Sequence, residues 1–89
     1  MNLEEKFNKA REQVMTLKDR PSNEMLLKLY GLNKQATVGD INIPAPAVFD
    51  FVAKAKYNAW EANKGVAKQA AMEQYIQLVE ELMTAKPES

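Results

Sequence analysis

Residues 30–40 read Tyr30-Gly31-Leu32-Asn33-Lys34-Gln35-Ala36-Thr37-Val38-Gly39-Asp40. On a helix, Tyr30, Asn33 and Lys34 fall at positions i, i+3 and i+4, so an aromatic ring, an amide and a cation share one face. Such a face suits a ligand with a flat ring and a phosphate. It equally suits the solvated edge of a core helix, because Tyr and Lys keep their polar tips in water above apolar stems. Gly39 is expected to end this helix as a left-handed C-terminal cap.

The helix that contains this run is expected to begin after Pro21, with Ser22 as its N-cap. Its apolar residues are Met25, Leu26, Leu29, Tyr30, Leu32 and Ala36. They cover more than half of the helix circumference. A stripe of this width predicts burial against two neighbouring helices, or against one neighbour and a ligand.

Apolar periodicity predicts three further helices, over residues 3–18, about 47–63 and about 67–85. The residues expected to face inward in the first of these helices are Leu3, Phe7, Ala10, Val14 and Leu17. In the helix over about 47–63 they are Val48, Phe51, Val52, Ala55, Ala59 and Ala62, and in the last helix they are Met72, Tyr75, Ile76, Val79, Leu82 and Met83. The chain is therefore predicted to be all-α, with four helices packed as a bundle.

The connection over residues 40–46 is long and contains two prolines, which exclude a helix interior. Ile41 and Ile43 are expected to pack down over the bundle. A connection of this length frees the third helix from lying antiparallel beside the second.

Composition narrows the function. Eighty-nine residues make one small domain, residues 1–89, and its 12 basic and 12 acidic side chains cancel. The neutral balance argues against nucleic acid and against an anionic membrane as partners. No apolar run approaches the length of a membrane span, so no stable membrane insertion is expected. The acidic N-terminal residues do not form a secretory signal, and a cytoplasmic location is predicted.

The chain has no Cys and no His, which excludes disulfides, thiol nucleophiles, Cys/His zinc sites and Ser-His-Asp triads. With three glycines it has no phosphate-binding loop of the G-x-x-x-x-G-K type. We therefore predict that the protein is not an enzyme and has no metal and no cofactor. A thioesterase, for example, would need a nucleophile–base pair that is not evident here.

The run from Lys34 to Asp40, followed by Lys54-Ala55-Lys56-Tyr57-x-Ala59-Trp60, resembles the signature of the acyl-CoA-binding protein family. Further matches are Leu17-Lys18, Lys64-Gly65, Ala71-Met72-x-x-Tyr75-Ile76 and Val79-Glu80-Glu81-Leu82. The resemblance covers nearly the whole chain. It implies a four-helix bundle in up-down-down-up order that binds long-chain acyl-CoA, carries and buffers it in the cytoplasm, and contacts acyl-CoA-using enzymes transiently. A monomer is expected because the domain can cover its own apolar stripes, although the wide apolar face of the second helix leaves dimerisation open.

The same resemblance implies the ligand contacts. Lys34 and Lys56 match positions that meet the phosphates, and Tyr30 and Tyr75 match positions near the head group and the thioester. Asn33 stands where the family usually has a second tyrosine of the head-group cluster. Two other departures are Met15, in place of a frequent lysine, and Tyr57, in place of a frequent tryptophan.

The types and positions of the individual residues leave more than one role open for some of them. Candidates for the acyl groove or for secondary contacts are Met15, Leu26, Leu27, Gly31 and Leu32. Trp60 is better explained as a core residue than as a ligand contact. The departures at Asn33 and Met15 also allow a different function, namely a helical protein-interaction module that has lost or weakened its ligand binding.

Overall fold

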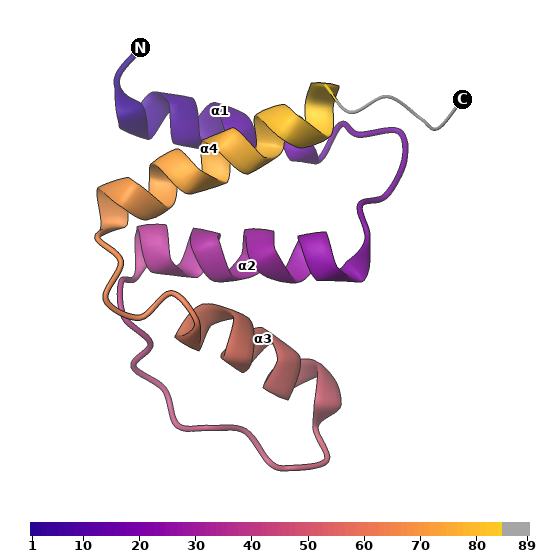
Figure 1. The fold of residues 1–89 in the computed structure, drawn as a ribbon, viewed down its shortest axis with the longest axis vertical. Helices are drawn as coiled ribbons and strands as arrows, with labels where there is room; N and C mark the ends of the chain where they lie inside the picture. Colours follow the sequence, from indigo (N-terminus) through magenta and orange to yellow (C-terminus); the bar gives the residue numbers. More distant parts are fainter. Residues whose placement is uncertain (85–89) are drawn as a thin grey trace.

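The computed structural model describes residues 1–84 and contains four helices: α1 (Leu3–Val14), α2 (Asn23–Thr37), α3 (Phe51–Glu61) and α4 (Lys68–Thr84). Figure 1 shows that α1 and α4 run in one direction across the molecule, whereas α2 and α3 run in the opposite direction. The predicted all-α fold with up-down-down-up order is therefore confirmed. Residue 85, where the fourth helix was expected to end, lies outside the described residues.

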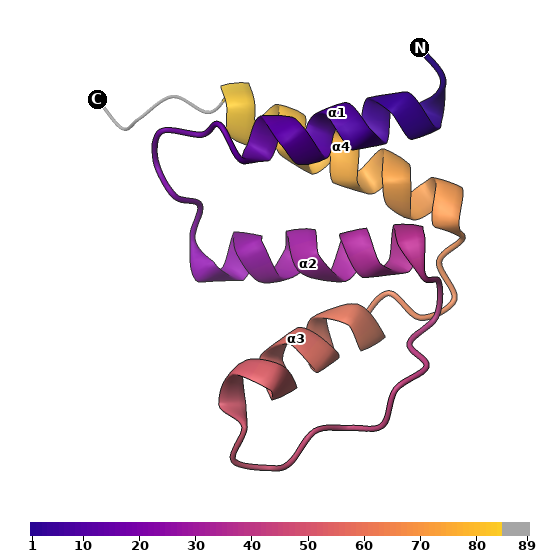
Figure 2. The ribbon, with the colours of Figure 1, turned by 180° about the vertical axis from the view of Figure 1, so that it is seen from behind.

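The helices pack in the order α1, α4, α2, α3, so that α2 lies between α4 and α3 (Figures 1 and 2). The described residues extend over 39 × 33 × 16 Å. Seen along the shortest dimension, α1 and α4 overlap, one behind the other (Figures 1 and 2). α3 lies at the edge of the bundle and packs on α2 alone.

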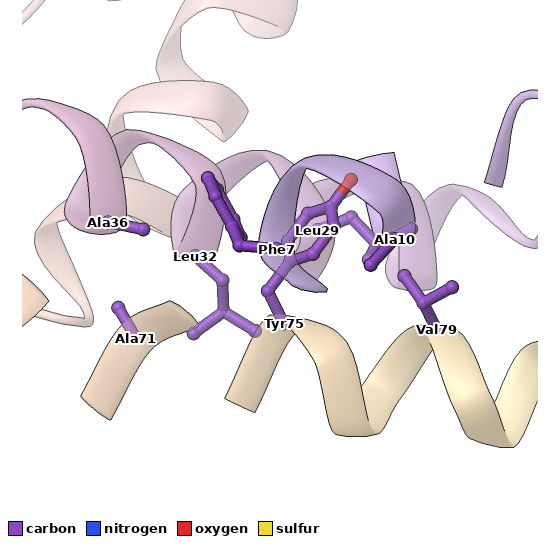
Figure 3. Close-up of a cluster of buried hydrophobic side chains, with 8 residues drawn as sticks. All are labelled: Phe7, Ala10, Leu29, Leu32, Ala36, Ala71, Tyr75 and Val79. Atoms are coloured by element: carbon purple, nitrogen blue, oxygen red, sulfur yellow. The ribbon is translucent and has the colours of Figure 1, made fainter. Parts of the chain in front are cut away.

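The core lies where α1, α2 and α4 meet (Figure 3). Its buried apolar residues are Phe7 and Ala10 from α1, Leu29, Leu32 and Ala36 from α2, and Ala71, Tyr75 and Val79 from α4. The rings of Phe7 and Tyr75 meet edge to face, with centroids 5.1 Å apart, a favourable arrangement for two aromatic quadrupoles. The stripes predicted for the first and fourth helices are thus largely confirmed, except that Met83 is exposed.

The prediction for the third helix was wrong in its start and in part of its inward face. The helix begins at Phe51, where the Asp50 side chain caps it by accepting from the Ala53 backbone N–H at 3.2 Å. Val48, Phe51 and Val52 are 68–77% exposed. The two prolines keep the preceding chain extended, and α3 packs on α2 alone, so it buries only a narrow stripe.

Two smaller predictions also need correction. The first helix ends at Val14 instead of residue 18, because the backbone N–H groups of Met15 and Thr16 turn to carbonyls three residues back and tighten the last turn. Ile43 is 49% exposed and Ala62 is exposed as well, so neither packs inward as expected.

Both predicted ends of the second helix are confirmed. Ser22 Oγ accepts a hydrogen bond from the Met25 backbone N–H at 3.2 Å. Gly39 has φ of 101° and its N–H donates to the Lys34 carbonyl at 3.2 Å. Only glycine takes this backbone conformation at little cost.

A polar clasp, a set of hydrogen bonds around the buried Gln35 and the exposed Asp40, joins the end of α2 to the turn between α3 and α4. The Gln35 amide donates to Asp40 Oδ1 at 2.9 Å and to the Val66 carbonyl at 2.8 Å. Asp40 Oδ1 also accepts from the Gly65 N–H at 2.8 Å, and Trp60 Nε1 donates to the Gly39 carbonyl at 2.8 Å. These bonds fix α3 relative to α2.

The clasp makes stability depend on pH. The Gly65 N–H, followed by the Gln35 amide and the Lys64 charge, holds the pKa of the exposed Asp40 below its ordinary value, although some desolvation of the carboxylate opposes the shift. A lowered folded-state pKa stabilises the fold above the unfolded value of about 3.9, and that contribution is lost as the pH falls through the folded pKa.

We expect acidification below about pH 4 to reduce the free energy of unfolding less steeply in Asp40→Asn than in the wild type. Urea unfolding at pH 3–6 measures this, with Asp19→Asn as the exposed-carboxylate control; equal slopes in the three proteins would contradict it.

Candidate functional site

Two lysines and two aromatic rings meet where α2 packs against α3. The Lys56 ammonium of α3 lies over the ring of Tyr30 on α2, with Nζ 5.5 Å from the ring centroid. The Lys34 ammonium of α2 lies over the ring of Trp60 on α3, with Nζ 4.9 Å from its centroid. Each helix thus contributes one cation and one ring to a pair of crossed cation–π contacts. Lys34 and Lys56, which are far apart in the sequence, lie on the same seam of the molecule.

The rings hold the cations without neutralising them. Trp60 is 2% exposed and its indole N–H is bonded to the Gly39 carbonyl, so its ring is a fixed support. Within residues 1–84, neither Lys34 nor Lys56 forms an ion pair with a carboxylate. Both ammonium groups therefore keep donors for an incoming anion such as a phosphate, which lysine binds as a compact point charge. The prediction that Trp60 belongs to the core is confirmed, although its ring also supports Lys34.

A largely apolar groove of about 480 Å³ lies beside these cations. It is lined by Arg20, Asn23, Leu26, Leu27 and Tyr30 on the α2 side, and by Phe51, Val52, Ala55 and Lys56 on the α3 side. Phe51 is 77% exposed, so the groove leaves aromatic surface in water when it is empty. A groove of this volume and chemistry fits an oily chain that needs shelter from water.

A second pocket, of about 650 Å³, is lined by residues of α1, α2 and α4. We call it the α1–α2 pocket; it is lined by Asn8, Arg11, Glu12, Val14, Met15, Asn33 and Tyr75. Its walls are more polar than those of the groove. The five main predicted site residues are therefore divided: Tyr30, Lys34 and Lys56 meet at the α2–α3 seam, whereas Asn33 and Tyr75 line the α1–α2 pocket.

Tyr75 belongs to both the core and this pocket. Its ring is 4% exposed and packs against Phe7. Burial raises the pKa of its hydroxyl, and the nearby Arg11 charge only partly opposes the rise. The hydroxyl is therefore neutral at physiological pH and is available as a donor to a ligand.

The secondary candidates are distributed over three places. Leu26 and Leu27 line the groove, but Met15 lies in the α1–α2 pocket and is 83% exposed. Leu32 is a core residue that also borders a cavity of about 510 Å³ on the opposite side of α2. Gly31 lies at the closest approach of α2 and α3, where an added Cβ would meet the Ala59 carbonyl oxygen at 2.3 Å.

Sequence reasoning missed several lining residues. Phe51, Val52 and Ala55 were assigned to the buried face of a bundle helix, and only the isolation of α3 at the edge turns them toward a groove. Arg20 and Arg11 gave no signal in the sequence, because an exposed arginine is ordinary.

Neither a metal-binding cluster of three or more acidic, His or Cys side chains nor a helix long and apolar enough to cross a membrane occurs within residues 1–84.

Comparison with known proteins agrees with this geometry. A family model described as acyl-CoA-binding protein matches residues 4–79. The acyl-CoA-binding protein homolog 1 of Caenorhabditis elegans is 52% identical over 77 residues, which cover 86% of this chain and 90% of that protein. The acyl-CoA-binding protein of Dictyostelium discoideum is 49% identical over 78 residues, which cover 88% of this chain and 93% of that protein.

The fold comparison is equally close. The crystal structure of Oryza sativa acyl-CoA-binding protein 2 superimposes with a TM-score of 0.88 at 43% identity, covering 92% of this chain and 91% of that one. The family match spans all four helices and includes both seam lysines and both pocket residues, Asn33 and Tyr75. The chain belongs to the acyl-CoA-binding protein family.

Proposed function

We propose that this protein binds long-chain fatty acyl-CoA esters, buffers their free concentration and delivers them to enzymes in the cytoplasm. Residues 1–89 would act as one acyl-CoA-binding domain and as a monomer, with no chemistry on the cargo. The observation that carries this proposal is the pair of ring-supported ammonium groups, Lys34 and Lys56, beside an apolar groove.

The chemistry of the ligand matches what each part of the site offers. An acyl-CoA ester has a nucleotide 3′-phosphate and a diphosphate at one end, which need cations. Its long hydrocarbon tail needs an apolar groove, and Leu26, Leu27 and Phe51 provide one. The adenine ring needs a flat or polar surface, for which the α1–α2 pocket is adjacent. Tyr30 lines the groove, and Asn33, one helical turn further along α2, lines the α1–α2 pocket, so one ligand can reach both.

A carrier role also agrees with the residue types at the site. The chain contains no His and no Cys, and the described site residues include no nucleophile paired with a base. A ligand held by ammonium groups, rings and apolar contacts is bound and released unchanged. Neutral overall charge favours a site that recognises its ligand by a few placed cations instead of a broad positive field.

The proposal is tested by titration calorimetry with palmitoyl-CoA, CoA alone and palmitate. We expect tight binding for the ester only. Lys34→Ala should raise its Kd roughly 5- to 30-fold, since a partly exposed cation–phosphate contact is worth about 1–2 kcal/mol. Lys28→Ala is the matched control, because Lys28 is an exposed lysine of the same helix that borders the opposite cavity.

Two results would contradict the proposal. Equal and weak heats for the three ligands would favour the interaction module that has lost its ligand. Equal effects of Lys34→Ala and Lys28→Ala would show that position on the α2–α3 seam is irrelevant.

A further inference from the structure

Arg11 of α1 is held in place at the α1–α2 pocket. Its guanidinium carbon lies 5.3 Å from the centroid of the Phe7 ring, and its Nη1 donates to Asn8 Oδ1 at 3.3 Å. Phe7 is 2% exposed and is itself fixed against Tyr75. One face of the guanidinium therefore rests on a rigid ring, and no ion pair with a carboxylate occupies it within residues 1–84.

The groups that share the pocket with Arg11 are polar and partly unpaired. Asn33 faces it from α2, and its Oδ1 atom is buried with no hydrogen-bond partner within the described residues. A buried acceptor without a partner is unfavourable, so rotation of the amide toward a donor in the pocket is favourable. Tyr75 adds a neutral hydroxyl, and Glu12 adds one opposing negative charge at the rim.

We propose that Arg11 is a specificity residue for the nucleotide half of the ligand: its guanidinium stacks on the purine ring in the α1–α2 pocket while Asn33 bonds the purine edge. A planar guanidinium stacks on flat rings and keeps donors at its rim for a phosphate of the same nucleotide. An asparagine amide presents one donor and one acceptor, the pattern that pairs with adenine. This inference rests on the proposed acyl-CoA binding and deepens it.

Arg11 can compensate for the aromatic surface and the charge that the residues at positions 33 and 15 do not provide. Asn33 offers no aromatic surface, and Met15 offers no charge, although both residues line the pocket. Arg11 supplies a flat surface and a positive charge together. Lys34 and Lys56 lie at the α2–α3 seam instead, so they bind phosphates without stacking on the base.

The test compares two ligands that share a tail and a thioester but differ in the nucleotide: palmitoyl-CoA and S-palmitoylpantetheine. We expect Arg11→Gln to raise the Kd for palmitoyl-CoA about three- to tenfold, as for a cation at a partly exposed aromatic contact. The Kd for S-palmitoylpantetheine should not change. Lys9→Gln is the matched control; it removes an equal charge from the same helix, at a residue that lines a different pocket.

Arg11→Lys separates the flat surface from the charge. It keeps the positive charge but removes the plane, and we expect it to lose at least half of the selectivity that Arg11→Gln loses. Full retention of selectivity in Arg11→Lys would overturn the stacking role. An equal change for both ligands in Arg11→Gln, or an equal change in Lys9→Gln, would overturn the inference as a whole.

The failure of the inference is distinguishable from failure of the proposed function. If the wild type binds palmitoyl-CoA more tightly than S-palmitoylpantetheine and Arg11→Gln leaves that difference intact, only the inference fails. If the wild type binds neither ligand, the carrier function itself fails.

Discussion

Lengthening the acyl chain of a CoA ester from eight to fourteen carbons should lower its Kd at least a hundredfold. Six further methylenes, at about 0.8 kcal/mol each, offer roughly 5 kcal/mol, from which the ordering of the tail subtracts. The groove of about 480 Å³ between α2 and α3 provides the apolar surface for them. A single lysine–phosphate contact offers less than half of that energy. The tail therefore sets affinity, and the nucleotide sets selectivity against free fatty acid.

Calorimetry across chain lengths measures this dependence, and a pair of valines supplies the control. Val52 lines the groove, whereas Val48 is similarly exposed but does not line it. Val52→Asn should flatten the dependence of Kd on chain length, and Val48→Asn should leave it unchanged. A flat series in the wild type, or the same slope in both variants, would contradict the assignment of the groove to the tail.

Gly31→Ala should destabilise the protein, although alanine is the better helix former. In an unobstructed helix this substitution gains about 1 kcal/mol. Here the new Cβ would lie 2.3 Å from the Ala59 carbonyl oxygen and 2.7 Å from its carbon, and backbone atoms cannot rotate away. Overpacking of this kind costs about 1–3 kcal/mol. We expect a net loss of up to about 2 kcal/mol in the free energy of unfolding, measured with urea.

The same substitution should also weaken ligand binding, because α3 must move away from α2. The movement would separate Lys56 from Tyr30 and widen the groove between the two helices. The difference in the free energy of unfolding between Lys28→Ala and Lys28→Gly, on the exposed face of α2, measures how much alanine stabilises this helix over glycine where nothing obstructs the side chain. A gain in stability for Gly31→Ala, similar to the gain of alanine over glycine at position 28, would show that α3 is not tightly packed there.

Much of this architecture was predictable because it depends on local chemistry. The steps of three and four between apolar residues predicted the first helix, whose Phe7 and Ala10 are buried. Ser22 and Gly39 predicted both ends of α2, since a side-chain acceptor and a left-handed glycine act within a few residues. The motif from Lys34 to Asp40 indicated the family, and the family implied the helix order.

The third helix shows where local rules fail. Its apolar residues are spaced as in a buried helix, yet Phe51 and Val52 are exposed. Periodicity reports which residues share a face, but not whether another element covers that face. Because α3 packs on α2 alone, part of its apolar face borders a groove instead of a core.

The sequence by itself determined the presence of four helices, both ends of α2, the family and the residue types available to a ligand. The tertiary structure alone decided which of these residues meet. It brings the Lys34 ammonium over the Trp60 ring and the Lys56 ammonium over the Tyr30 ring, and it places Met15 and Leu26 in different pockets. The physical reason is that caps and periodicity act over one or two turns of helix. The site instead depends on the close α2–α3 approach at Gly31 and on the position of α3 at the edge of the bundle, where it packs on α2 alone.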